Sequence, residues 1–283
     1  MSPAPAAGER VQLGITLPSF RDTLDPALAV AGAADAHGVD GVFVYDHLFR
    51  RAADGTRRPA IEMLVMMGAV AAATRRVAIG SLVARASLRP PATLAAGLDT
   101  VARIVGSDRL CIAVGAGDGE SREENETFGL GFGSIEDRVD ALRATVLELR
   151  DRGYPVWVGG TDSRVRALAA EAADGWNRWG APVDRFAEQA AAVLGASARE
   201  PFTLSWGGLV VLGDTDDEAA AKATRLGVAP DGPVLVGGPD TIAAALRPYV
   251  DAGATWLTLA PIDSSDPDNC RILGQAVAPR LRG

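Results

Sequence analysis

Short apolar runs alternate with longer alanine-rich segments along the chain, and this alternation restricts the fold more than any other feature. Runs that are apolar at nearly every position are typical of strands buried on both faces, whereas the segments between them have the period of helices. The order of strand, helix and strand predicts a parallel sheet covered by helices. Eight strands are expected, and they begin at Val11, Gly41, Arg76, Arg109, Tyr154, Asp174, Phe202 and Thr255.

The segments between these strands carry helix boundary signals. Asp25 before Pro26 is typical of a helix start, and Gly38 and Gly253 are typical of positions just beyond a helix end. Helices are expected at residues 26–36, 61–74, 91–105, 135–150, 163–173, 184–198, 216–226 and 240–252.

Eight strand–helix pairs in about 250 residues predict a single (β/α)8 TIM barrel. An open doubly wound sheet is the alternative, but that fold needs a dinucleotide fingerprint after its first strand, where this chain has GITLPSF. The 283 residues, 48% of them hydrophobic, can bury one large core. We therefore expect a mobile leader at residues 1–10 and one barrel domain at residues 11–283.

Composition excludes several classes of function. The net charge of −8 argues against broad binding to nucleic acid or to an anionic membrane. No apolar stretch has the roughly 20 residues of a membrane span, and the opening residues lack the pattern of a secretion signal. The two cysteines, Cys111 and Cys270, show neither metal-type spacing nor a disulfide framework. We expect a cytoplasmic protein with a small-molecule substrate and no metal.

The second strand ends in Asp46 and His47. In a barrel, the loops after the carboxyl ends of the strands build the active site, so this histidine is expected at the functional rim as a proton donor or acceptor. Asp46 would orient it or contact a cofactor ring. The alternative is that both residues only begin a loop. The other histidine, His37, lies at a helix end, where the helix dipole explains it.

The fourth strand continues into AVGAGDGES, which places Gly115 and Gly117 on either side of Ala116. Glycines let a ligand approach the backbone closely. The stretch is not a dinucleotide fingerprint, because Glu120 stands where the last glycine would be. Asp118 and Glu120 would supply a second acid or contact the substrate. A strained turn with solvated acids is the alternative.

The fifth strand continues into GGTDSR, in which Gly159, Gly160 and Thr161 precede a helix start with Arg164 in its first turn. Free N–H groups at a helix start suit a phosphate. The stretch lacks the ending of a nucleoside-triphosphate loop, so NTP hydrolysis is not expected. A tight turn alone is the alternative.

Two further groups of side chains bear on ligand binding. The loop after His47 contains four arginines, which belong either to a solvated loop or to a site for a polyanionic cofactor tail. The tryptophans are expected in the core rather than against a ligand. The arginines are Arg50, Arg51, Arg57 and Arg58.

The chain resembles the luciferase-like monooxygenase superfamily, and within it the oxidoreductases that use the deazaflavin coenzyme F420. The resemblance lies in GVDGVFVYDHL, in TRRVAIGSLVARASLRPP with the helix and strand after it, in PVWVGGTDSRVRALAAEAADGWN and in VLVGGPDTIAAALRPYVDAGATWLTL. It implies a barrel that binds a flavin or deazaflavin at the carboxyl rim.

The resemblance also implies roles for individual residues. Asp46 and His47 would contact the deazaflavin headgroup, with His47 as the acid or base. Ser81 to Ala84 would form a third-strand segment with a bulge and a non-prolyl cis peptide against the ring, and Ser81, Leu82 and Val83 of this segment would bind the cofactor.

The remaining roles concern the other two loops. Gly159, Gly160 and Thr161 would take the phosphate, and Asp118 falls where some relatives have an acidic catalytic residue. The long insertion that relatives usually carry before the fifth strand is short here, so we expect an open pocket or one closed by a partner subunit.

The resemblance thus predicts hydride transfer between a small organic substrate and F420. The alternatives are a two-component monooxygenase that uses FMN and a separate flavin reductase, and a flavin-binding barrel without catalysis. A homodimer is expected from the family, as is a separate reductase for F420 or flavin.

Overall fold

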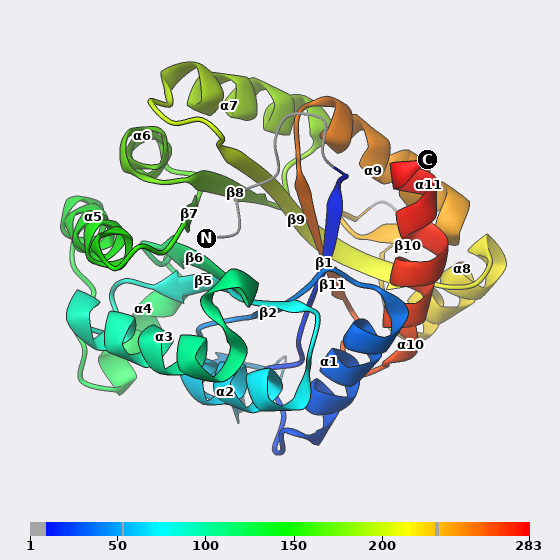
Figure 1. Cartoon of the computed structure of the whole chain (residues 1–283). Helices are drawn as coiled ribbons and strands as arrows, with labels where there is room; N and C mark the ends of the chain where they lie inside the picture. Colours follow the sequence, from blue (N-terminus) through cyan, green and yellow to red (C-terminus); the bar gives the residue numbers. More distant parts are fainter. Residues whose placement is uncertain (1–9, 53, 230–231) are drawn as a thin grey trace.

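Eight parallel strands close into a barrel that is surrounded by helices, as the computed structural model of the chain shows (Figure 1). The structure describes residues 10–52, 54–229 and 232–283, so residues 1–9 of the predicted leader lie outside the described residues. The barrel closes where the last strand pairs with the first, in register from Gln12 with Trp256 to Ile15 with Leu259. The (β/α)8 barrel predicted from the sequence is confirmed.

The barrel strands coincide with the predicted apolar runs, and most of their residues are buried because helices cover the outer face while side chains fill the inside. In barrel order they are β1 (Gln12–Thr16), β2 (Gly41–Val44), β5 (Ala78–Arg85), β6 (Leu110–Gly115), β7 (Val156–Gly159), β8 (Gly175–Trp179), β9 (Thr203–Leu212) and β11 (Trp256–Pro261).

The predicted helices are also present, with ends that differ by a few residues. Within the described ranges, none of the helices is both long and apolar enough to cross a membrane. The helices are α1 (Asp25–His37), α2 (Met63–Ala73), α3 (Pro91–Val105), α5 (Ile135–Asp151), α6 (Ser163–Ala172), α7 (Val183–Ala196), α8 (Asp216–Arg225) and α9 (Pro239–Asp251).

The eight predicted strands and eight predicted helices do not form eight simple strand–helix pairs. Helices α8 and α9 both lie between β9 and β11, together with a short strand, β10 (Leu235–Gly237), that pairs with the end of β9. The helical layer after β11 is supplied by the C-terminal segment, for which no helix was predicted. It consists of α10 (Asp268–Arg271), a π-helical stretch (Ile272–Val277) and α11 (Ala278–Arg282).

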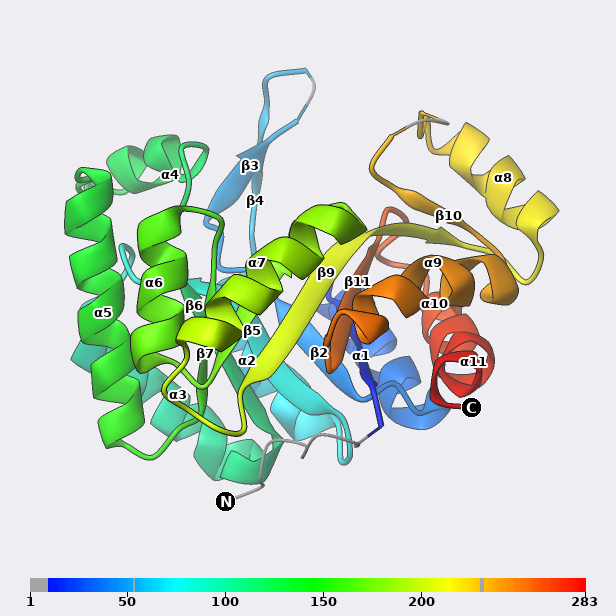
Figure 2. The same cartoon turned by 90° about the horizontal axis from the view of Figure 1, so that it is seen from above.

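Two elements stand at the carboxyl rim where only loops were predicted (Figure 2). The arginine-rich loop forms an antiparallel hairpin of β3 (Phe49–Arg51) and β4 (Arg57–Pro59). The loop after β6 forms the short helix α4 (Ser121–Thr127). Residues 152–155 alone link α5 to β7, so the short connection read from the sequence is confirmed.

Large aromatic side chains fill the barrel interior. Phe43 meets Trp256 edge to face, with ring centroids 5.5 Å apart, and lies 6.3 Å from Trp157. Room for Phe43 comes from Gly14 and Gly80, where an added Cβ would lie 2.5 Å and 2.6 Å from its ring. The interior is therefore a packed core rather than a pore.

Candidate active site

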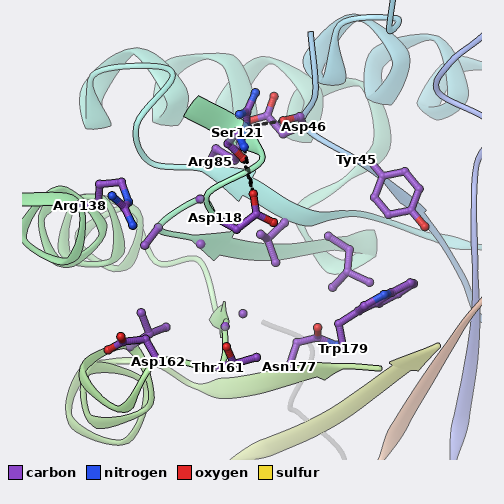
Figure 3. Close-up of a pocket in the computed structure, with 18 of the residues that line it drawn as sticks. Tyr45, Asp46, Arg85, Asp118, Ser121, Arg138, Thr161, Asp162, Asn177 and Trp179 are labelled. Carbon is purple, nitrogen blue, oxygen red and sulfur yellow. Dashed lines mark hydrogen bonds between the residues drawn. The ribbon is translucent and has the colours of Figure 1, made fainter. Parts of the chain in front are cut away.

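A cavity of about 650 Å³ opens at the carboxyl rim, over the ends of β2, β5, β6, β7 and β8 (Figure 3). Its volume suits a cofactor-sized ligand. Apart from Glu120 and Arg164, all but one of the residues predicted for the site line it. They are Asp46, His47, Leu82, Val83, Gly115, Ala116, Gly117, Asp118, Gly159, Gly160 and Thr161.

Ser81 is the exception. It is fully buried, and its hydroxyl donates to the carbonyl of Ala113 at 2.8 Å, so it fastens β5 to β6 below the cavity. The strand bulges between Ser81 and Ala84, and the peptide between Leu82 and Val83 is cis. Both backbone features were expected from the family resemblance and are confirmed.

The side chain of Val83 explains why two of the positions predicted for the site must be glycine. Gly115 and Gly159 are paired across β6 and β7, and an added Cβ would lie 2.6 Å from Val83 Cγ2 at the first and 2.5 Å from Val83 Cγ1 at the second. Atoms this close must shift. The two glycines therefore make room for the valine side chain that forms the cavity wall, which is a different reason from the close ligand approach that we predicted.

Gly117 and Gly160 are needed for their backbone conformation. Their φ angles are +76° and +151°, values that favour glycine. At Gly160 an added Cβ would also lie 2.8 Å from Val165 Cγ1. These two residues turn the chain from strand ends into the loops that carry Asp118 and Thr161.

His47 is held by a carboxylate that the sequence did not single out. Its Nδ1 lies 2.6 Å from Glu124 Oε1, and the other oxygen of Glu124 accepts from the Leu48 amide at 2.7 Å and from Arg85 Nη2 at 2.8 Å. The Glu124 side chain is only 5% exposed, whereas that of His47 is 33% exposed and lines the cavity.

Glu124 is ionised in this arrangement. Burial alone would raise the pKa of its carboxyl, but hydrogen bonds from His47 and from the Leu48 amide, with the charges of His47 and Arg85, outweigh burial and hold that pKa below its usual range. The carboxylate therefore accepts a hydrogen bond from Nδ1–H of the histidine, which leaves Nε2 as the ring nitrogen that can exchange a proton.

Asp46 does not orient His47, which was one of the two roles predicted for it, and its contact with a cofactor ring stays a prediction. Its carboxylate is buried, accepts from the Arg85 amide at 2.8 Å and forms an ion pair with Arg89 at 2.8 Å. Its carbonyl accepts from Arg85 Nε at 2.7 Å. Asp46 therefore fixes the ends of β2 and β5 relative to each other, and Glu124 orients the histidine.

Asp118 lies at the mouth of the cavity. Its Oδ1 accepts from the amide and the hydroxyl of Ser121, at 3.0 Å and 2.9 Å, which ties it to the start of α4. Figure 3 shows its other oxygen turned toward the open space. Glu120, which was also predicted as a second acid, is exposed and lies outside the cavity lining.

One end of the cavity can hold an anion. Gly160 and Thr161 lead into α6, whose first turn is capped by Asp162, and Arg138 reaches the same end from α5 (Figure 3). Among the described residues, the buried Nε of Arg138 has no hydrogen-bond partner. Its Nη1 donates to the neutral carbonyl of Gly133 at 2.7 Å, so within the described residues no carboxylate balances its charge.

Arg164 does not serve this anion site as the sequence suggested. Its guanidinium forms ion pairs with Glu136, at 2.9 Å, and with Asp162, at 3.3 Å. Its charge is therefore balanced within the protein, and Arg138 supplies the positive charge at this end of the cavity.

The opposite end is aromatic. Tyr45 and Trp179 meet edge to face there, with ring centroids 6.3 Å apart (Figure 3). Burial raises the pKa of Tyr45 to about 12, although a hydrogen bond with Thr16 and the charge of Arg50 lower it, so the phenol stays protonated. Trp179 lines the cavity, which corrects the expectation that every tryptophan packs in the core. The other four are buried as expected.

The arginines of the β3–β4 hairpin are largely engaged. Arg51 Nε and Arg57 Nη2 bind Glu123 on α4, each at 2.8 Å, and Arg50 lies over the ring of Phe20, 4.8 Å from its centroid. The hairpin is therefore an exposed element that is clamped onto the helix that carries Glu124.

The chain is similar to proteins of one family. The sequence model of the luciferase-like monooxygenase family matches residues 5–230. An F420-dependent glucose-6-phosphate dehydrogenase of Nakamurella multipartita is 33% identical over 131 residues, which are 46% of this chain. The match covers 36% of that protein, so the chain matches about a third of the length of this relative.

Solved structures share the fold. An F420-dependent secondary alcohol dehydrogenase in complex with an F420–acetone adduct superposes with a TM-score of 0.78 at 18% identity, over 97% of this chain and 100% of that one. The oxygenating constituent of 3,6-diketocamphane monooxygenase of Pseudomonas putida, in complex with FMN, superposes with a TM-score of 0.71 at 17% identity, over 96% and 99% of the chains.

Proposed function

Because the chain belongs to the luciferase-like monooxygenase family, we propose that it is an oxidoreductase that uses F420 to transfer a hydride to or from a carbon of a small organic substrate. The observation that carries this proposal is the histidine at the cavity, His47, held 2.6 Å from the buried carboxylate of Glu124. The F420-dependent relative, which is 33% identical over part of the chain, supports the choice of cofactor.

The residues of the cavity fit such a cofactor. Leu82 and Val83 offer an apolar wall to a planar ring, and the aromatic end lies across the cavity mouth from the anion end. At the anion end, the start of α6 and the unpartnered Nε of Arg138 suit a phosphate.

When a hydride moves to or from the carbon of an alcohol or carbonyl group, a proton must move to or from its oxygen. When an alcohol is oxidised to a carbonyl, its carbon loses a hydride and its hydroxyl loses a proton, and both return in the reverse direction. A bound deazaflavin supplies the hydride acceptor or donor at its C5. His47 Nε2 takes or gives the proton, while the ionised Glu124 holds Nδ1–H and stabilises the imidazolium that forms.

Asp118 serves the substrate rather than the cofactor in this proposal. One of its oxygens is engaged by Ser121, and the other faces the cavity mouth. A carboxylate in this position accepts a hydrogen bond from a substrate hydroxyl and so orients the reacting carbon toward the ring.

The test is a parallel fluorescence titration of the protein with F420 and with FMN, followed by assays of hydride transfer to or from F420 with a panel of alcohols and carbonyl compounds. We expect F420 to bind and turn over, and His47→Ala to bind it but lose turnover. Binding of FMN alone, with oxygen-dependent product in the presence of a flavin reductase, would identify a monooxygenase instead. Binding without turnover across the panel would indicate a barrel that has lost catalysis.

A further inference from the structure

A second cavity, of about 460 Å³, adjoins the anion end of the first and shares Thr161 with it. It lies between α6, β8 and α7, and the guanidinium groups of Arg166, Arg178 and Arg185 line it. Resting on the proposed function, we infer that this cavity binds the carboxylates of the oligoglutamate tail of F420.

The three arginines are available to an anion. In the part of the chain that the structure describes, none of them lies within ion-pair distance of a carboxylate. Arg166 Nη1 donates to the carbonyl of Thr161 at 2.6 Å, and Arg178 Nε donates to Gln189 Oε1 at 2.9 Å. Both acceptors are neutral, so these bonds hold the guanidinium groups in place without balancing their charge.

The arrangement is electrostatically unfavourable without a ligand. Burial lowers the pKa of Arg178, and the charges of Arg185 and Arg166 lower it further. Glu188 also lines the cavity, but it is exposed and is a single carboxylate against three cations. In a chain with a net charge of −8, a cavity that gathers three uncompensated arginines is suited to a polyanion.

The position of the second cavity beside Thr161 indicates which polyanion it would bind. In F420 the phosphate continues through a lactyl group into γ-linked glutamates, each with a free carboxylate, whereas FMN ends at its phosphate. A phosphate held at Gly160 and Thr161 would direct that tail into the second cavity, because Thr161 borders both spaces. The hairpin is a poorer site for the tail, since Glu123 already binds Arg51 and Arg57.

The experiment compares F420 that carries several glutamates with the form that ends at the phospholactate. We expect the wild-type protein to bind the glutamylated form about tenfold more tightly at low salt, and the advantage to shrink as salt screens it. Arg185→Gln should reduce the advantage without changing affinity for the shorter form. Arg166→Gln should also reduce the advantage, although its loss frees the carbonyl of Thr161 at the phosphate site. Thermal denaturation checks that both variants fold.

Arg58→Gln, on the exposed hairpin near the same rim, is the matched control and should keep the whole advantage. Equal affinity of the wild-type protein for the two forms would overturn the inference, as would a loss of the advantage in Arg58→Gln but not in the cavity variants. If the cavity variants raised the KM for a phosphorylated substrate but kept the whole preference for glutamylated F420, the cavity would be assigned to the substrate. That result would also overturn the inference.

The two proposals fail in different ways. If the shorter form binds and turns over but glutamates add nothing, the tail site is wrong and the proposed function stands. If neither form binds, the proposed function is wrong and the tail site is wrong with it.

Discussion

His47 Nδ1 lies 2.6 Å from Glu124 Oε1, although the two residues are 77 positions apart in the chain and belong to different rim loops. Arg85 and the Leu48 amide bind the other oxygen of the same carboxylate, so it cannot turn away from the histidine. This contact joins the loop after β2 to helix α4 and fixes the orientation of the imidazole ring.

Replacing Glu124 should impair catalysis more than binding. Glu124→Gln keeps the shape of the side chain but removes the charge that stabilises the imidazolium, so we expect kcat to fall about 100-fold with little change in cofactor Kd. Steady-state kinetics and a cofactor titration measure the two effects. The neighbouring Glu123→Gln is the control, because Glu123 binds only the exposed hairpin arginines. An equal loss in both variants would contradict this role.

The same carboxylate should make stability depend on pH. The pKa of Glu124 is lower in the folded protein than the value of about 4.3 expected after unfolding, so its stabilisation is complete above that value and is lost as pH falls through the folded pKa. We expect the wild type to exceed Glu124→Gln by about 1–3 kcal/mol in unfolding free energy near pH 7. Urea denaturation between pH 7 and pH 3 should show this difference shrinking. A difference that does not change with pH would refute the linkage.

Arg138 should contribute to affinity only when the ligand carries a phosphate. Since its buried Nε has no partner among the described residues, we expect Arg138→Gln to weaken binding of a phosphorylated flavin or deazaflavin about tenfold and to leave the phosphate-free forms unaffected. Arg143→Gln on the same helix is the control, because that side chain is paired with Glu171. Equal weakening of both ligand forms would mean that Arg138 only supports the fold.

The packing of Val83 against Gly159 can be tested by rescue. Gly159→Ala places a Cβ 2.5 Å from Val83 Cγ1, so we expect it to cost about 1–3 kcal/mol of stability and to push the valine into the cavity, weakening cofactor binding. Adding Val83→Ala removes the clash and should restore much of both losses. Gly119→Ala, where an added Cβ meets nothing within 4 Å, is the control. Additive losses in the double variant would argue against this contact.

The local pattern of apolar and polar residues was sufficient to predict the barrel and the position of its carboxyl rim. The apolar runs and alanine-rich segments predicted all eight barrel strands, because a strand buried on both faces leaves a continuous apolar signal. The family resemblance read from the sequence is confirmed by the match over residues 5–230. It also anticipated the bulge after Ser81 and the cis peptide before Val83.

Shorter elements gave no such signal. The strands of the β3–β4 hairpin have three residues each and α4 has seven, too few for a periodic pattern to stand out. Within α4 the three glutamates at 123, 124 and 126 are alike in sequence, and only Glu124 faces His47. Which acid points inward depends on where the helix lies.

The order of the barrel strands, their approximate ends and many of the residues at the rim were thus already specified along the chain, since each depends on burial and on neighbours close in sequence. Contacts between loops were not. The pairing of His47 with Glu124, the use of Gly115 and Gly159 to accommodate Val83, and the meeting of three uncompensated arginines beside Thr161 arise when the closed barrel brings distant segments together. Periodicity carries no information about which side chains meet across a barrel, so these contacts required the folded structure.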